Sequence, residues 1–212
     1  MQRYMKSEMP FHGVQAPAQK RIFRQIFKQY PMANQAEWHA GMLDLWRNAG
    51  CREERYGAIA LSAVRPYRVF QDVKSLAVYE EMIVTGAWWD FVDSLSGRLG
   101  ELLLDFPARI EKKMVRWATD KNLWKRRSSI ILQLKLKETT NSRLLFDNIT
   151  ANMADREFFI RKAIGWALRE YGKTSAAEVI EFVTANRARL SPLSKKEALR
   201  VLVKQGVIQE QR

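Results

Sequence analysis

A tryptophan and a carboxylate stand one helical turn apart in the stretch GAWWDFVDSL, residues 86–95. Trp89 and Asp93 are four residues apart, which places them on the same face if the segment is a helix. A fixed carboxylate can stabilise positive charge that develops on a sugar as its glycosidic bond breaks, or it can position an attacking water. An electron-rich indole beside it attracts a cationic base. The pair is therefore suited to chemistry on a positively charged nucleotide.

A plainer interpretation stays open for the same two residues. Trp89 could shield a junction between helices, and Asp93 could pair with a nearby cation as an ordinary surface ion. Gly97 and Gly100 continue this face, and each costs a helix about 1 kcal/mol relative to alanine. These glycines indicate that something approaches the face closely. Trp88 falls instead on the apolar stripe of the same helix and is explained by packing.

Apolar residues recur at helical spacing over nearly the whole chain, and no segment alternates as a strand would. Two capping boxes, Ser175 to Glu178 and Ser194 to Glu197, mark the starts of late helices. We therefore expect an all-α protein with helices over residues 16–30, 37–46, 52–64, 73–83, 88–104, 109–120, 123–137, 140–153, 157–171, 175–186 and 194–205.

Three segments are weakly similar to one another: ERYGAIAL, KRRSSIIL and IRKAIGWA. They fit a period of roughly 35 residues, which is typical of stacked helix pairs. Such pairs build HEAT-like solenoids with a long concave surface, and a basic one could cradle a duplex. An irregular helical bundle is the alternative.

The chain has 212 residues, which favours a single domain over 1–212. Its 36 Lys and Arg against 23 Asp and Glu give a net charge of +13, which indicates a polyanionic partner, nucleic acid before a membrane. One cysteine excludes an internal disulfide, and with only two histidines we expect no metal and no other cofactor. No segment has the composition of a signal peptide or a membrane span, so a cytoplasmic location is expected, nucleoid-associated when DNA is bound.

Four stretches together resemble the DNA alkylation repair family, the AlkD-type HEAT-repeat DNA glycosylases. They are RYMKSEMPFHGVQAPAQKR, GAWWDFVDSLS, DKNLWKRRSSIILQLK and REFFIRKAIGWALREYGKTSA, in the family's order and over nearly the whole chain. The start is shorter than is usual in the family, so a first helix is expected to be missing or truncated. The resemblance implies a HEAT-like solenoid with a concave basic DNA-binding groove. It also implies a monofunctional DNA glycosylase, acting as a monomer, that removes 3-methyladenine and 7-methylguanine from duplex DNA.

The resemblance also implies roles for individual residues. The catalytic aspartate falls on Asp93, and the catalytic cleft tryptophans fall on Trp89 and Trp166. The family's arginine in the W-x-x-R segment falls on Arg127, to which we assign a contact with the DNA backbone because a guanidinium binds phosphate bidentately. Further DNA contacts are expected from Lys125, Arg126, Lys162, Tyr4 and Gln15.

Two other classes of protein share the charge and the fold. A non-catalytic HEAT-repeat protein that binds damaged or unusually shaped DNA would have no need of Asp93. A protein-binding scaffold would use its concave face for a partner helix and would show no salt-sensitive affinity for DNA. The joint presence of Trp89, Asp93, Arg127 and Trp166 favours the enzyme.

Overall fold

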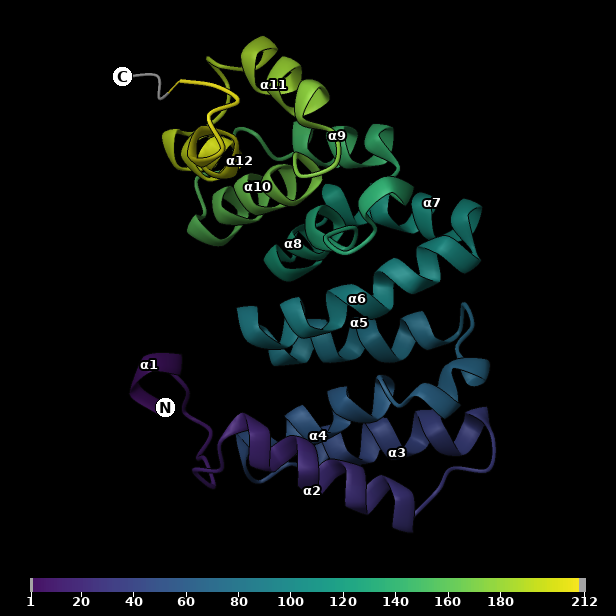
Figure 1. Cartoon of the computed structure of the whole chain (residues 1–212). Coiled ribbons are helices and arrows are strands. Elements are labelled where there is room, and N and C mark those ends of the chain that lie inside the picture. The colour runs from purple at the N-terminus through teal and green to yellow at the C-terminus, as the bar shows by residue number, and fades with distance from the viewer. Residues whose placement is uncertain (1, 210–212) are drawn as a thin grey trace. The chain divides into compact units, whose positions relative to one another are not determined.

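The computed structural model describes residues 2–209, and all regular elements in this range are helical (Figure 1). This confirms the all-α helical-repeat prediction, whereas the basic groove stays a prediction. None of the described helices combines the length and apolar character that crossing a bilayer requires. The α-helices are α1 (Gln2–Met5), α2 (Ala16–Gln29), α3 (Gln35–Arg47), α4 (Arg52–Ser62), α5 (Ser75–Gly86), α6 (Trp89–Asp105), α7 (Pro107–Ala118), α8 (Leu123–Ile131), α9 (Ser142–Thr150), α10 (Phe158–Tyr171), α11 (Ala176–Ala185) and α12 (Pro192–Lys204), with 3₁₀ turns η1 (Arg65–Phe70) and η2 (Lys137–Thr139).

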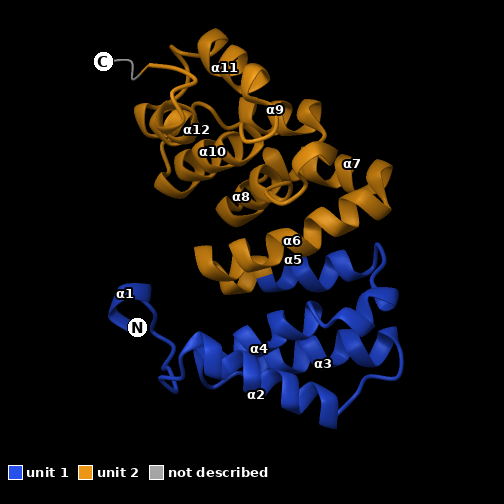
Figure 2. Ribbon diagram, in the orientation of Figure 1, with its two compact units in different colours: residues 1–82 blue, residues 83–212 orange. Residues whose placement is uncertain are grey.

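The chain divides into two compact units, residues 1–82 and 83–212 (Figure 2). The boundary falls inside α5, whose last turn belongs to the second unit. A single domain over 1–212 stays a prediction, and residues 1 and 210–212 lie outside the described residues.

The first unit is built around the buried face of α3. Trp38, Met42 and Trp46 follow one another at four-residue steps and are almost completely buried. The Trp38 indole N–H donates to the Leu61 carbonyl oxygen of α4 at 3.1 Å, which satisfies its polar atom inside the core. A tryptophan-rich helix thus packs on α4 without leaving this donor unpaired.

The core stripe of α6 was largely predicted from the sequence. Its apolar residues at three- and four-residue steps are fully buried, namely Val92, Leu95, Leu99 and Leu102. Trp88 does not belong to this stripe, because it is the N-cap of α6, with extended backbone, and α6 begins at Trp89. The prediction that Trp88 lies on the helical core face is therefore wrong.

The glycines of α6 are not explained by the approach of a ligand, which the sequence had suggested. A Cβ added at Gly100 would lie 2.6 Å from the carbonyl oxygen of Leu132, the C-cap of α8, so the close neighbour is the protein's own backbone. At Gly97 a Cβ would meet only the end of the Lys135 side chain, at 3.6 Å, which is ordinary contact. These glycines therefore do not indicate that a ligand approaches this face.

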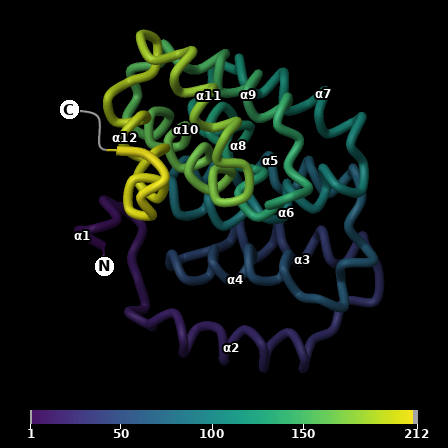
Figure 3. The backbone as a smooth tube through the Cα atoms, turned by 45° about the horizontal axis from the view of Figure 1, so that its top comes forward, coloured from purple at the N-terminus to yellow at the C-terminus, as the bar shows by residue number. Residues whose placement is uncertain are grey.

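Helices α10 and α12 lie side by side (Figures 1 and 3), and a glycine makes this possible. A Cβ at Gly165 would stand 2.5 Å from the Cβ of Glu197.

The predicted capping box at Ser194 is wrong: α12 begins at Pro192, and its N-cap is Ser191, whose hydroxyl accepts from the Ser194 N–H at 3.0 Å. Ser194 instead donates its hydroxyl to the Arg161 carbonyl oxygen at 2.9 Å, so it joins the two helices.

Candidate functional site

A buried ion pair lies at the centre of the candidate site in the second unit. Arg127 of α8 donates from Nε to Asp93 Oδ1 and from Nη2 to Asp93 Oδ2, each at 2.8 Å. The side chains are 5% exposed for Arg127 and 15% exposed for Asp93. Two parallel bonds between a guanidinium fork and a carboxylate fix both groups in one plane. Asp93 is thus held in one orientation rather than free to rotate.

The same guanidinium contacts a third helix. Arg127 Nη1 donates to the carbonyl oxygen of Phe159, in the first turn of α10, at 2.6 Å. Arg127 therefore joins α6, α8 and α10 through one planar group. The Phe159 carbonyl is a site component that the sequence analysis missed, and no sequence signal marks a backbone oxygen for such a role.

Burial has a clear effect on the acidity of Asp93. Desolvation raises the pKa of the Asp93 carboxyl above its ordinary value, and the negative charge of Asp90 acts in the same direction. The hydrogen bonds and the positive charge of Arg127 oppose this rise. Arg127 consequently favours the ionised form of the carboxylate.

An aromatic cluster lies next to this pair. The Phe159 ring packs edge-on to Trp88 at 5.6 Å between centroids and against Trp124 at 5.1 Å. Trp88 and Trp124 contact each other at 6.2 Å. The buried indole N–H of Trp88 has no hydrogen-bond partner among the described residues. Packing among aromatic rings thus explains Trp88. It does so at the N-cap of α6 and not on the apolar face of the helix, where Trp88 was expected.

The two catalytic tryptophan candidates are both half-buried and both belong to the second unit. Trp89 is the first residue of α6, one turn before Asp93. Trp166 lies on α10, seven residues after Phe159, which places it on the same side of the helix about two turns further along. Asp93 and Trp89 therefore share a helix, and Arg127 connects that helix to the one that carries Trp166.

The cations predicted to contact DNA in the second unit already have acidic partners in this structure. Lys125 faces Asp120 at 3.4 Å, and Lys162 faces Glu197 at 3.0 Å. Arg126 binds Asp155 at 2.9 Å. Their phosphate contacts stay a prediction, and each would require the cation to share or leave its present partner.

Arg127 differs from these three cations because it is buried as well as paired. An exposed fork ready for a phosphate was expected at this position. The structure instead shows each of its three nitrogens donating one hydrogen bond, to Asp93 or to the Phe159 carbonyl oxygen. Arg127 therefore holds the Asp93 side chain rather than facing solvent.

Tyr4 and Gln15 belong to the first unit. Tyr4 lies on α1 with 78% of its surface exposed, and Gln15 is the exposed N-cap of α2. Both side chains are exposed to solvent, so a ligand that binds the first unit can reach them.

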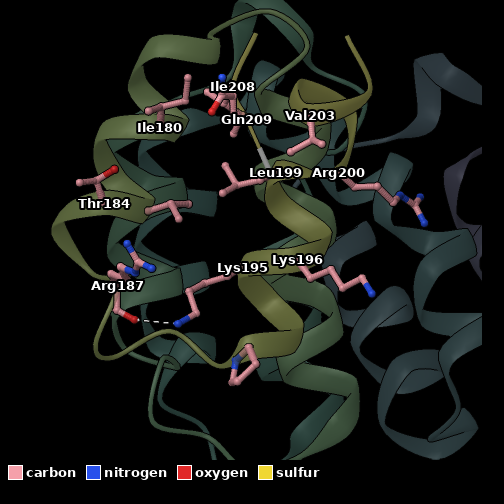
Figure 4. A pocket seen from close by; sticks show the side chains of 12 residues that line it. Ile180, Thr184, Arg187, Lys195, Lys196, Leu199, Arg200, Val203, Ile208 and Gln209 are labelled. Carbon is pink, nitrogen blue, oxygen red and sulfur yellow. Dashed lines mark hydrogen bonds between the residues drawn. The ribbon is translucent and has the colours of Figure 1, made fainter. Parts of the chain in front are cut away.

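A pocket of about 460 Å³ is formed by α11, α12 and the residues that follow each of them, as Figure 4 shows. It combines apolar residues such as Ile180 and Leu199 with cationic ones such as Arg187 and Arg200. None of the predicted site residues lines it, so it is separate from the Asp93 site.

Comparison with known proteins assigns the chain to a family. The family model described as DNA alkylation repair enzyme matches residues 1–202. A solved structure described as a predicted DNA alkylation repair enzyme from Enterococcus faecalis superposes with a TM-score of 0.83 at 31% identity, covering 96% of this chain and 93% of that one. No curated protein matches the sequence. Residues 1–202 make up nearly the whole chain, and this chain therefore belongs to the DNA alkylation repair enzyme family.

Proposed function

We propose that this protein is a DNA glycosylase that hydrolyses the N-glycosidic bond of positively charged N-alkylated purines, such as 3-methyladenine and 7-methylguanine, in duplex DNA. The observation that carries the proposal is the largely buried Asp93 carboxylate, fixed by two hydrogen bonds from Arg127 and placed one turn after Trp89. Membership of the DNA alkylation repair enzyme family supports it.

The alkylated base makes a strong general acid unnecessary. Alkylation at N3 or N7 leaves the purine with a positive charge, so the base departs as a neutral molecule when the glycosidic bond breaks. Positive charge then develops on the deoxyribose, where a fixed anion lowers the barrier. Asp93 is the carboxylate that supplies this anion in the proposal.

Arg127 leaves part of the carboxylate available for this task. A carboxylate has about four lone-pair positions, and Arg127 uses one on each oxygen of Asp93. The remaining positions can accept a hydrogen bond from an attacking water or face the sugar. In this proposal Arg127 is a positioning residue, because it acts through Asp93 and keeps it ionised.

The tryptophans supply affinity for the charged nucleotide. The faces of Trp89 and Trp166 attract a cationic purine by cation–π contact, worth about 0.5–2 kcal/mol for each ring. A neutral, undamaged base gains no such contact, and its glycosidic bond breaks less readily. Selection for alkylated bases therefore combines binding with the reactivity of the lesion itself.

The test is release of 7-methylguanine from methylated duplex DNA under single-turnover conditions. Wild type is compared with Asp93→Asn and with a control, Asp147→Asn, which removes a carboxylate that is 65% exposed on α9. We expect Asp93→Asn to bind DNA but to excise at least about a hundredfold more slowly, and Asp147→Asn to behave as wild type.

The competing function is a non-catalytic protein that binds alkylated DNA. It predicts tight binding by the wild type with neither 7-methylguanine nor 3-methyladenine released. That outcome would replace the glycosylase proposal.

A further inference from the structure

Three side chains that are common metal ligands meet in the first unit, apart from the site of Asp93. His12 Nε2, Cys51 Sγ and a carboxylate oxygen of Glu54 all lie within 4.8 Å of one another. His12 Nε2 and Glu54 Oε1 are 2.9 Å apart. The sequence separates His12 from the other two by about forty residues, so the fold is what brings the three together.

The segment that carries His12 is held in place by a buried acid. Glu53 is 3% exposed, and its carboxylate accepts from the backbone N–H groups of His12, Gly13 and Val14 at 2.9–3.3 Å. Three backbone donors on one carboxylate fix the course of the chain ahead of α2. His12 is therefore positioned by a built-in anchor rather than by chance contact.

The other two ligands are fixed by the start of α4. Cys51 is the N-cap, and Glu54 is the third residue of the helix. Glu54 Oε2 accepts from the N–H groups of Gly50 at 2.6 Å and Cys51 at 3.3 Å, which turns Oε1 toward His12. Both side chains thus point to the same place from one helical turn.

Imidazole, thiolate and carboxylate are the ligand types that proteins use for zinc. In a tetrahedral site with Zn–N near 2.0 Å and Zn–S near 2.3 Å, neighbouring ligand atoms lie roughly 3.3–3.6 Å apart. His12 Nε2 and Glu54 Oε1 are closer than this, at 2.9 Å, and Cys51 Sγ lies within 4.8 Å of both, so shifts of the three side chains would be enough to form the site. The His12 and Glu54 side chains are 51% and 39% exposed, so water can occupy a fourth position.

We propose that His12, Cys51 and Glu54 bind one Zn²⁺ ion, with water as the fourth ligand, and that the ion fastens the segment ahead of α2 to the first turn of α4. Binding of Zn²⁺ forms the zinc–thiolate bond and releases the thiol proton to solvent. The proposal is independent of the glycosylase activity.

Cobalt(II) is the probe, because tetrahedral cobalt with a thiolate ligand has a charge-transfer absorption that other ligands do not give. The full-length protein, with Cys51 kept reduced, is titrated with Co²⁺ and then with Zn²⁺. Wild type is compared with Cys51→Ser, in which serine keeps a good N-cap, and with His12→Asn. The control is His39→Asn, which removes the other histidine, bonded to Ser75 Oγ at 2.9 Å.

We expect one equivalent of Co²⁺ to give the thiolate band in wild type and in His39→Asn, and Zn²⁺ to displace it. Cys51→Ser should lose the band, and His12→Asn should bind Co²⁺ at least about tenfold more weakly. Absence of the band in wild type at saturating Co²⁺ would overturn the proposal and leave His12 and Glu54 as a hydrogen-bonded pair of side chains. Equal affinity in wild type and His12→Asn would also overturn it, since the metal would then be bound elsewhere.

Discussion

Replacing Arg127 by glutamine distinguishes between two roles for this residue: holding the Asp93 carboxylate and contacting a DNA phosphate. The substitution removes three hydrogen bonds at once and leaves Asp93 as a buried carboxylate without its partner. Breaking a buried ion pair costs about 3–5 kcal/mol. We expect the lower end of this range, about 3 kcal/mol near neutral pH, because 15% of the Asp93 side chain stays exposed to water.

The loss of folding stability caused by Arg127→Gln should depend on pH in a defined direction. Arg127 lowers the pKa of Asp93 against the effect of burial, so its removal should raise that pKa further. A carboxyl whose folded pKa is raised favours the folded state at low pH, and this contribution is lost as the pH rises through the folded pKa. The destabilisation relative to wild type should therefore shrink as the pH falls, when Asp93 in the variant takes up a proton.

Urea unfolding at about pH 7.5 and about pH 5 measures the destabilisation by Arg127→Gln and its change with pH. The control is Arg143→Gln, whose side chain is 91% exposed and lies 3.8 Å from Asp147 on α9, and whose effect should stay below about 1 kcal/mol at both pH values. A destabilisation by Arg127→Gln that does not change with pH would refute the reasoning. Unchanged stability, with the salt slope of DNA binding lower by about one, would show that Arg127 contacts a phosphate instead.

Three further predictions concern packing, charge and the aromatic site. Gly100→Ala should lower the unfolding free energy by about 1–3 kcal/mol, because the new Cβ would meet the Leu132 carbonyl oxygen at 2.6 Å. Gly97→Ala should raise the unfolding free energy by up to about 1 kcal/mol in the same urea assay, because alanine favours a helix more than glycine does. Lys162→Ala should change stability by less than about 1 kcal/mol, since this side chain is 40% exposed, and should reduce the salt slope of DNA binding by about one if Lys162 contacts a phosphate. Trp166→Ala should slow excision of 7-methylguanine roughly two- to thirtyfold, measured in single turnover; an unchanged rate would remove Trp166 from the site.

Local features of the fold could be predicted from the sequence because helical periodicity is itself local. The buried stripe of α6, from Val92 to Leu102, follows directly from three- and four-residue spacing. Boundaries were less accurate: the helix expected over 123–137 ends at Ile131. At α12 two serines compete for the cap, and Ser191 takes it because Pro192 fits the first helical position.

The partners within the candidate site could not be predicted in the same way. Asp93 and Arg127 are 34 residues apart, and only packing of α6 on α8 brings them together. The sequence predicted a DNA contact for each member of the triplet Lys125, Arg126 and Arg127. Consecutive positions on a helix differ in direction by about 100°, so three neighbours point to different sides of α8, and Arg127 is the one that faces inward. Tertiary packing therefore decides which arginine meets the carboxylate.

The ion pair also bears on how a polyanion can come near an acidic group. Asp93 and Arg127 together carry no net charge, so from a distance the pair acts as a small dipole whose field falls off faster than that of a lone anion. The long-range attraction exerted by a chain with a net charge of +13 is consequently not weakened by this carboxylate. Only a group that comes within contact distance experiences the negative oxygens of Asp93. For the proposed glycosylase, this means that an anion can lie at the reactive centre without long-range repulsion of the DNA phosphates.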